Sequence, residues 1–306
     1  MTLRPLATIP LPAIGAEDVV VDTDGAVWTG TEDGSLWRVS PAEGRTTRVA
    51  HTGGRPLGLE LLPDGRILVC DAERGLLAVT PDSGAVERLV TAIDGRPMRF
   101  CNNAAVATDG TIFFTDTSRH YGVRQWKADL LEATSSGRLL VRHPDGAVET
   151  LLDGLEFANG VALSADESFV AVAETGARTI VRHWLSGPRA GENDLFTGEL
   201  PGYPDNLSLG SDGLVWLAVA SPRDPLVERL KRGPLAVRRA TWRLPPRLQP
   251  APKRTVRVLA LDDLGRVVHD LEADATSWHM ATGVREHRGR VWLGSLIEPA
   301  IAWFDR

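Results

Sequence analysis

The stretch VVVDTDGAVWTGT, residues 19–31, reads as an apolar strand, a tight turn at Asp24–Gly25 and a second strand. Alternating apolar residues on both sides of an Asp-Gly pair predict a β-hairpin, and the pair favours a type I′ turn. The same phrase recurs five more times, as LELLPDGRILVCD (59–71), AAVATDGTIFFTD (104–116), VALSADESFVAVA (161–173), LSLGSDGLVWLAV (207–219) and VREHRGRVWLGSL (284–296).

The spacing of these hairpins predicts the architecture. Successive turns lie at positions 24, 64, 109, 166 and 212, and further hairpins such as 34–50 and 137–152 fall between them. Each repeat therefore holds about four strands, and four-stranded units at this period are typical of β-propeller blades. We predict an all-β, six-bladed β-propeller that occupies residues 1–306 as one domain. A β-sandwich would not repeat one strand–turn–strand phrase six times.

Residues 222–254 form an insertion that delays the sixth hairpin, and this insertion is basic. It holds 10 of the 34 Lys and Arg residues but 2 of the 40 Asp and Glu residues, so it carries +8 and the remainder of the chain −14. The run LVERLKR (226–232) predicts a partly helical segment. We favour a solvated helix that packs on one face over a pocket lid or a contact with an acidic membrane surface.

The composition argues against several classes of function. A net charge of −6 disfavours a nucleic-acid partner for the whole chain. Cys70 and Cys101 are too few for a disulfide framework, and no CxxC pair offers a zinc site. No apolar run approaches the length of about 18 residues that spans a membrane. Residues 1–20 make a poor signal peptide, so we expect a cytoplasmic protein.

One position in each repeat gathers oxygen-bearing side chains. The residue seven places before each turn begins the strand nearest the propeller axis, so these six residues are expected to face the same end of the central channel. They are Glu17, Leu57, Asn102, Asn159, Asp205 and Ala281. Two carboxylates and two carboxamides that converge on an axis suit Ca²⁺, which binds about 6–8 oxygen atoms. The alternative is that these side chains cap strand ends or satisfy backbone groups.

The chain also resembles a known family, the strictosidine synthase-like branch of the SMP-30/gluconolactonase superfamily. The similarity is carried by stretches that include RFCNNAAVATDGTIFFTDTS (99–118), LEFANGVALSADESFVAVAET (155–175) and LPGYPDNLSLGSDG (200–213). The phrases FxNGVxLS and LPGxPDN within them are specific, and the similarity extends over essentially the whole chain. It implies a calcium-dependent six-bladed propeller. The metal ligands that it implies are Glu17, Asn102, Asn159 and Asp205. This chain departs from the family at Asn103, where Asp is common, and so lacks a carboxylate beside the metal.

The hydrolytic members of that superfamily imply roles for individual residues. A bound Ca²⁺ polarises a carbonyl or phosphoryl oxygen, and we predict that Asp205 is the base or nucleophile. We predict that Asn103 and Asn206 orient substrate or ligands through their amides. Four further residues are candidates for binding substrate, although each has a packed or surface-exposed alternative: Arg99, His120, Trp278 and His279.

The sequence thus predicts a hydrolase of lactones or related esters that uses Ca²⁺, or another divalent cation, on a small-molecule substrate. Two alternatives stay open on the same scaffold, because a fold alone does not decide a reaction. One is a condensing or cyclising enzyme, since plant strictosidine synthase joins an amine to an aldehyde with a glutamate and no metal. Glu286 lies in the last inner hairpin, but no motif supports it in that role. The other is a non-enzymatic propeller with a structural metal.

Overall fold

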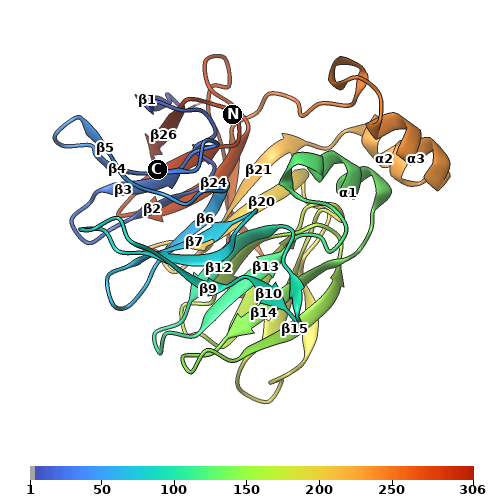
Figure 1. The fold of residues 1–306 in the computed structure, drawn as a ribbon. Coiled ribbons are helices and arrows are strands. Elements are labelled where there is room, and N and C mark those ends of the chain that lie inside the picture. Colours follow the sequence, from blue (N-terminus) through green and yellow to red (C-terminus); the bar gives the residue numbers. More distant parts are fainter. Residues whose placement is uncertain (1–3) are drawn as a thin grey trace.

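In the computed structural model, which describes residues 4–306, the chain forms six four-stranded antiparallel sheets around a central axis (Figure 1). The innermost strand of each sheet contacts the innermost strands of both neighbouring sheets, so the sheets close into a ring. This arrangement is the predicted six-bladed β-propeller. Each of the six recurring phrases forms the two inner strands of one blade, which confirms the interpretation of the repeat.

The strands of each blade run outward from the axis in sequence order for the first five blades. Blade one consists of β2 (Val19–Val21), β3 (Val27–Gly30), β4 (Ser35–Ser40) and β5 (Arg45–His51). Blade two consists of β6 (Pro56–Leu61), β7 (Ile67–Asp71), β8 (Gly75–Val79) and β9 (Val86–Val90). Blade three consists of β12 (Cys101–Val106), β13 (Ile112–Asp116), β14 (Gly137–Arg142) and β15 (Val148–Leu155).

Blade four consists of β16 (Ala158–Leu163), β17 (Phe169–Glu174), β18 (Thr179–Trp184) and β19 (Asn193–Thr197). Blade five consists of β20 (Gly202–Leu209), β21 (Val215–Pro222), β22 (Arg257–Leu261) and β23 (Val267–Glu272). A short hairpin of β10 (Ala92–Ile93) and β11 (Arg96–Pro97) lies between blades two and three in the chain.

The last blade joins the two ends of the described chain. From the axis outward it contains β24 (Ala281–His287), β25 (Arg290–Ser295), β26 (Ala300–Asp305) and, at its outer edge, β1 (Ala7–Pro10). Strand β1 pairs antiparallel with β26, so that Ala7 lies opposite Trp303. The sequence repeat did not predict this strand, because β1 lies outside the recurring phrase. Its pairing fastens the first blade to the sixth and closes the propeller.

The Asp-Gly turns of the inner hairpins differ from the predicted type. Gly25 has a left-handed φ of 80°, whereas Asp24 does not, so type I′ is wrong for this turn. The N–H of Gly25 donates to the carbonyl of Asp22 at 3.0 Å, which is a type I turn followed by a left-handed glycine. Among the inner hairpins of residues 4–306, the sixth has positive φ at both central residues, 53° at Arg288 and 85° at Gly289.

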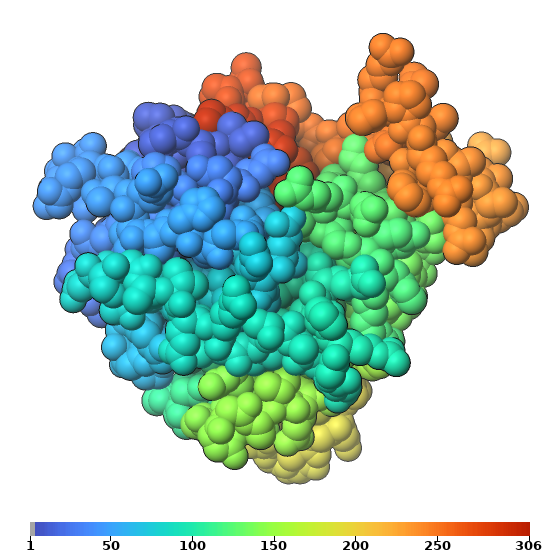
Figure 2. All heavy atoms as spheres, in the orientation of Figure 1, coloured from blue at the N-terminus to red at the C-terminus, as the bar shows by residue number. Residues whose placement is uncertain are grey.

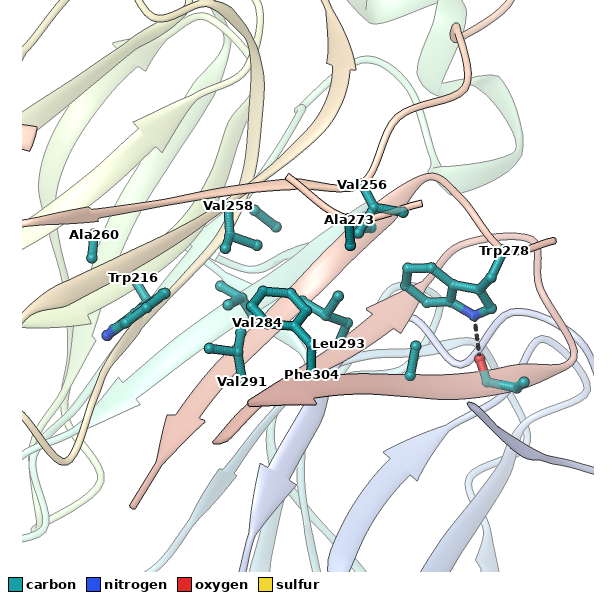
Figure 3. Close-up of a cluster of buried hydrophobic side chains, with 14 residues drawn as sticks. Trp216, Val256, Val258, Ala260, Ala273, Trp278, Val284, Val291, Leu293 and Phe304 are labelled. Carbon is teal, nitrogen blue, oxygen red and sulfur yellow. Dashed lines mark hydrogen bonds between the residues drawn. The ribbon is translucent and has the colours of Figure 1, made fainter. Parts of the chain in front are cut away.

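Apolar side chains fill the space between neighbouring blades. In the layer between blades five and six, Trp216 and Val258 pack with Val284 and Phe304 (Figure 3). Trp278 belongs to this layer, is 1% exposed and donates its indole N–H to the carbonyl of Ala300 at 2.9 Å. The prediction that Trp278 contacts substrate is therefore wrong. Its hydrogen bond and burial make it part of the core.

Two helical segments extend from one end of the propeller, and both leave a blade after its second strand. Blade three carries a short 3₁₀ turn (Val123–Gln125) and helix α1 (Trp126–Glu132). The predicted basic insertion carries helices α2 (Pro225–Lys231) and α3 (Leu235–Trp242) and a 3₁₀ turn, and so is partly helical as predicted. It lies inside blade five, between β21 and β22, ahead of the last blade.

Glu132 of helix α1 carries a buried carboxylate that binds the insertion. Glu132 accepts hydrogen bonds from the phenol of Tyr121 at 2.9 Å, the indole of Trp242 at 2.8 Å and Arg239 at 3.2 Å. Its backbone carbonyl also accepts from Arg238 at 2.7 Å. We call α1 with its preceding turn, together with the insertion, the cap (residues 123–132 and 222–254). No helix within residues 4–306 is long and apolar enough to span a bilayer.

Candidate functional site

The four oxygen-bearing residues of the repeat lie on one pocket at the end of the central channel that the cap covers. The pocket has an empty volume of about 940 Å³, part of which is open to solvent. Its inner end is lined by Glu17, Asn102, Asn159 and Asp205. Leu57, from the same position of blade two, also lines it, whereas Ala281 is fully buried. The four oxygen-bearing residues selected by their distance from the turns thus lie together in the structure.

A β-bulge sets the direction of these side chains. The pairing of the first two strands shifts register between Cys101 and Ala104 in blade three and between Ala158 and Val161 in blade four. Blades two, five and six have a shift at the corresponding place. A bulge breaks the strict alternation of a strand and re-aims its side chains. Because the bulge repeats around the ring, one sequence position faces the channel in several blades.

The two asparagines are held in a fixed orientation by threonines on the adjacent strands. Asn102 donates its Nδ2 to Thr117 Oγ1 at 2.8 Å, and that hydroxyl donates to the carbonyl of Ala158 at 2.7 Å. Asn159 donates in the same way to Thr175 Oγ1 at 3.0 Å. Since each hydroxyl gives its only hydrogen to a carbonyl, it must accept from the amide. The Oδ1 atoms of both asparagines are thereby left buried and without a hydrogen-bond partner among residues 4–306.

The carboxylates of the pocket lie in an environment that opposes their negative charge. Burial, together with repulsion from Asp205 and Asp18, raises the pKa of Glu17 well above its usual value. Burial is also the main cause that raises the pKa of Asp205 to about 7. The amide of Asn159 opposes this shift by donating to Asp205 Oδ1 at 2.8 Å. A cation at this point would remove the repulsion.

A second layer of polar residues supports the pocket from below. Asn206 donates its amide to both oxygens of Glu17, at 3.2 and 3.3 Å. Asn103 donates to Asp18 at 3.3 Å and accepts from the backbone N–H of Val161 at 2.8 Å. Both asparagines are buried and neither lines the pocket. Their predicted role in orienting ligands fits Asn206, which holds Glu17, whereas contact with substrate fits neither.

Three other predicted substrate residues lie away from the pocket. Arg99 and His120 are exposed on the surface and are absent from the pocket wall. His279 contacts Glu298 at 2.5 Å and Arg254 at 3.3 Å, and does not line the pocket either. These residues stand close to the inner strands in sequence, but their side chains leave the backbone in other directions. We correct their assignment as substrate contacts accordingly.

The walls of the pocket are apolar and come largely from the cap. Phe100 and Phe157 meet edge to face with ring centroids 5.8 Å apart near the inner end. Trp126 of α1 and Val227 of α2 line the outer part, and so does the segment 250–252 of the insertion. The favoured interpretation of the insertion as a helix packed on one face is therefore incomplete. Part of the insertion forms the pocket wall, which is the lid-like alternative.

The sequence analysis missed several residues that adjoin the four candidate metal ligands. Thr117 and Thr175 follow the turns of blades three and four at matching offsets, once the one-residue-longer turn of blade four is allowed for. Asp18 follows Glu17 directly, and burial raises its pKa to about 6. Lys127, which carries the one basic side chain among the residues that line the pocket, was also missed. A count at neighbouring offsets would have found Asp18.

The donor set at the inner end of the pocket fits a hard cation. Two unpaired carboxamide oxygens and two carboxylates with raised pKa values are the groups that Ca²⁺ binds and that softer metals avoid. Residues 4–306 contain no cluster of three or more His, Cys, Asp and Glu side chains suited to a metal. A cation here would therefore depend on Asn102 and Asn159 as much as on the acids.

Comparison with known proteins decides the family. The model of the SMP-30/gluconolactonase/LRE-like region matches residues 27–232, and a strictosidine synthase-like N-terminal model matches residues 2–39. The chain belongs to the SMP-30/gluconolactonase/LRE-like family. Within this family it is 35% identical to strictosidine synthase-like protein 10 of Arabidopsis thaliana over 96% of this chain and 86% of that protein. It is 32% identical to the adipocyte plasma membrane-associated protein of Rattus norvegicus, over 94% and 82%.

Solved structures of SMP-30/gluconolactonase type share the fold. A gluconolactonase from Xanthomonas campestris superposes with a TM-score of 0.72 at 16% identity, over 98% of this chain and 89% of that one. The calcium-binding protein regucalcin from Agrobacterium tumefaciens superposes with a TM-score of 0.69 at 15% identity, over 99% and 95%. At these identities the likeness shows the six-bladed propeller alone.

Proposed function

We propose that this protein is a Ca²⁺-dependent hydrolase of lactones or related esters. The observation that carries the proposal is the pair of buried Oδ1 atoms of Asn102 and Asn159. They have no hydrogen-bond partner in the described part of the chain, and they stand beside two carboxylates in one pocket. Buried polar atoms are rarely left unpaired in a protein. The gluconolactonase and the calcium-binding regucalcin with the same fold support the choice of reaction and metal.

We assign two roles to the polar residues of the pocket: binding the metal and accepting a proton. Glu17, Asn102, Asn159 and Asp205 would hold Ca²⁺, which when bound supplies a Lewis acid for a carbonyl oxygen. Asp205 accepts from Asn159 through Oδ1, and its Oδ2 has no hydrogen bond within residues 4–306. That oxygen is the one we assign to take the proton from the attacking water.

The apolar walls determine which ester fits. The residues between the inner end and the mouth include Phe100, Phe157, Trp126 and Leu130. Apolar walls with a few polar groups at one end favour a ligand with the same division. We therefore propose a substrate whose carbonyl lies at the inner end and whose larger part is hydrophobic.

The condensing alternative has weaker support in this pocket. Glu286 accepts hydrogen bonds from the N–H and hydroxyl of Ser211 at 2.7 and 2.8 Å and from the N–H of Gly289 at 2.7 Å. Both oxygens of the Glu286 carboxylate thus accept hydrogen bonds at the opposite end of the last hairpin. Glu17 is the one glutamate on the pocket wall, and it belongs to the proposed metal site.

The deciding experiment combines metal content with turnover. The purified protein is analysed for bound metals, and then tested on lactones, aryl esters and phosphotriesters before chelation, after chelation and after Ca²⁺ is restored. We expect bound calcium and lactone or ester turnover that disappears and returns with it. Turnover that survives complete removal of metal would overturn the proposal and favour metal-independent chemistry. No turnover on any substrate, with calcium bound, would favour a structural metal.

The cytoplasmic location is part of the same proposal and stays a prediction. Fractionation of cells that produce the protein tests it directly. A relative named for association with the plasma membrane makes the membrane fraction the informative comparison.

A further inference from the structure

The basic residues of the insertion fall into two groups, one with partners in the protein and one without. The paired basic residues are Lys231, Arg238, Arg239, Lys253 and Arg254. Both acids of the insertion are engaged as well. Asp224 caps α2 and lies 3.5 Å from Lys253, and Glu228 accepts from Tyr203 at 3.0 Å and pairs with Arg178 at 3.3 Å.

The unpaired group is exposed and uniformly positive. Five arginines of the insertion are exposed and form no ion pair within residues 4–306, namely Arg223, Arg229, Arg232, Arg243 and Arg247. No acidic residue of the insertion remains to compensate them. These five arginines contribute +5 to the surface of the segment, and no acid of the segment neutralises them.

Apolar side chains are exposed on the same segment. Of the 12 large hydrophobic residues that are exposed in residues 4–306, five lie within these 33 residues: Leu226 (56%), Leu235 (39%), Val237 (47%), Leu244 (42%) and Leu248 (61%). Figure 2 shows the insertion, in orange, as a projection that stands out from the body of the molecule. We call these five apolar residues and the five unpaired arginines the outer face of the insertion.

We propose that the outer face of the insertion binds an anionic phospholipid surface. Arginines are attracted to anionic headgroups, and leucines between them bury their side chains at the boundary with the acyl chains. The rest of the chain carries −14 and is repelled by the same surface, so the attraction acts on the insertion alone. Charge complementarity therefore fixes the orientation of the molecule on the membrane.

This orientation has a consequence for the pocket. The segment 250–252, which follows the outer face directly in the chain, lines the pocket. A molecule docked through the insertion therefore has the pocket mouth near the lipid, where hydrophobic compounds concentrate. Docking itself does not depend on the proposed hydrolase activity, because the outer face contains none of the residues at the inner end of the pocket.

A lipid surface fits the outer face better than a protein or nucleic acid does. The exposed apolar residues come from α2, from α3 and from the turn after it, so they are spread over several short elements of the projection. A nucleic acid would bind the arginines but would not bury the exposed leucines. A fluid, anionic and apolar layer uses both kinds of side chain without a fixed shape.

Vesicle co-sedimentation of the full chain tests this proposal. We compare phosphatidylcholine vesicles with vesicles that also contain phosphatidylglycerol. Two double variants are tested, Leu244→Ser with Leu248→Ser, and Arg243→Gln with Arg247→Gln. The control is Leu195→Ser with Leu264→Ser, which removes leucines that are 59% and 69% exposed outside the insertion.

We expect binding to the anionic vesicles only, weakened roughly tenfold or more by either insertion variant and unchanged by the control. Melting temperature and metal content are measured alongside, and we expect both to stay at the wild-type values. Absence of binding to anionic vesicles overturns the proposal. Binding that the arginine variant abolishes and the leucine variant leaves intact also overturns it, because that result indicates a purely electrostatic ligand such as a nucleic acid or an acidic protein.

Discussion

Asn102 Nδ2 lies 2.8 Å from Thr117 Oγ1, and this contact decides which atom of the asparagine is offered to the pocket. The threonine hydroxyl gives its hydrogen to the carbonyl of Ala158, so it can only accept from the amide. The carbonyl oxygen of Asn102 is then the free atom. Blade four repeats the arrangement with Asn159 and Thr175. Both asparagines therefore present their side-chain oxygen atoms as potential metal ligands.

Removal of the Thr117 hydroxyl is predicted to weaken calcium binding with the fold intact. In Thr117→Val the amide of Asn102 is free to rotate, so its oxygen is no longer directed at the pocket. Loss of a contact that orients a ligand costs about 10–100-fold in metal affinity. Calorimetric titration with Ca²⁺ measures the change. Thr117→Ser, which keeps the hydroxyl, should bind Ca²⁺ as the wild type does. Equal Ca²⁺ affinity of the Val and Ser variants would contradict the role of this hydroxyl in orienting Asn102.

Asp205 is predicted to matter more for turnover than for metal retention. Asp205→Asn keeps an oxygen that can ligate but removes the group that accepts a proton. We expect kcat on a lactone to fall by roughly 100-fold or more, the usual contribution of a general base. Metal content measured on the same preparation should stay near that of the wild type. Unchanged kcat would show that another group takes the proton.

The repeat predicted the fold and the inner end of the pocket because both depend on local patterns. The bulge sits at one place in every inner strand where the pairing shifts register, so a constant offset from the turn found Asn102 and Asn159. The same count could not place Trp278 or His279. Whether a side chain before an inner strand enters the blade or the channel depends on packing between strands. The sequence shows residue types but not that packing.

The cap was beyond the reach of sequence patterns for a different reason. Glu132 and Trp242 are 110 residues apart, and their hydrogen bond joins two insertions from different blades. Neither α1 nor α3 exceeds eight residues, so neither gives a helical repeat long enough to be recognised. The charge of the insertion was visible in the sequence. The division of that charge into paired and unpaired residues required the structure.

The metal-free protein is predicted to lose stability as the pH rises. Burial raises the pKa of Asp205 to about 7 and that of Asp18 to about 6, above the unfolded values near 4. Between pH 4 and 7 the folded state therefore holds protons that the unfolded state has released, and the free energy of unfolding falls as pH increases. We expect the melting temperature to drop by about 5 °C or more from pH 5 to pH 8.

Calcium and a matched variant test the origin of that slope. Ca²⁺ binds the deprotonated carboxylates, so its addition should flatten the dependence above pH 6. Asp205→Asn should have a smaller slope without metal. Asp194, whose pKa two arginines lower to about 2, loses its charge below this range and does not contribute there. A melting temperature that is constant or rises between pH 5 and pH 8 would contradict the prediction.

Glu132 is predicted to control how firmly the insertion is held against α1. The carboxylate is 7% exposed and accepts from Tyr121, Trp242 and Arg239, and the pKa of Glu132 is lowered: burial raises it, but the hydrogen bonds, that of Trp242 first, outweigh this. In Glu132→Gln at least one of these donors faces an NH₂ group in place of an oxygen. A loss of about 2 kcal/mol increases the population of the detached insertion about thirtyfold.

Trypsin reports this detachment because residues 222–254 are rich in arginine and lysine. We expect cleavage within the insertion to be about thirtyfold faster in Glu132→Gln if opening and closing are fast relative to cleavage. The control is Glu192→Gln, which removes a surface carboxylate that pairs with Arg189 at 2.8 Å in blade four. Since segment 250–252 and Val227 line the pocket, the same variant should raise KM more than it lowers kcat. Equal cleavage rates in the two variants would show that the apolar contacts of α1 with α2 and α3 hold the insertion without help from Glu132.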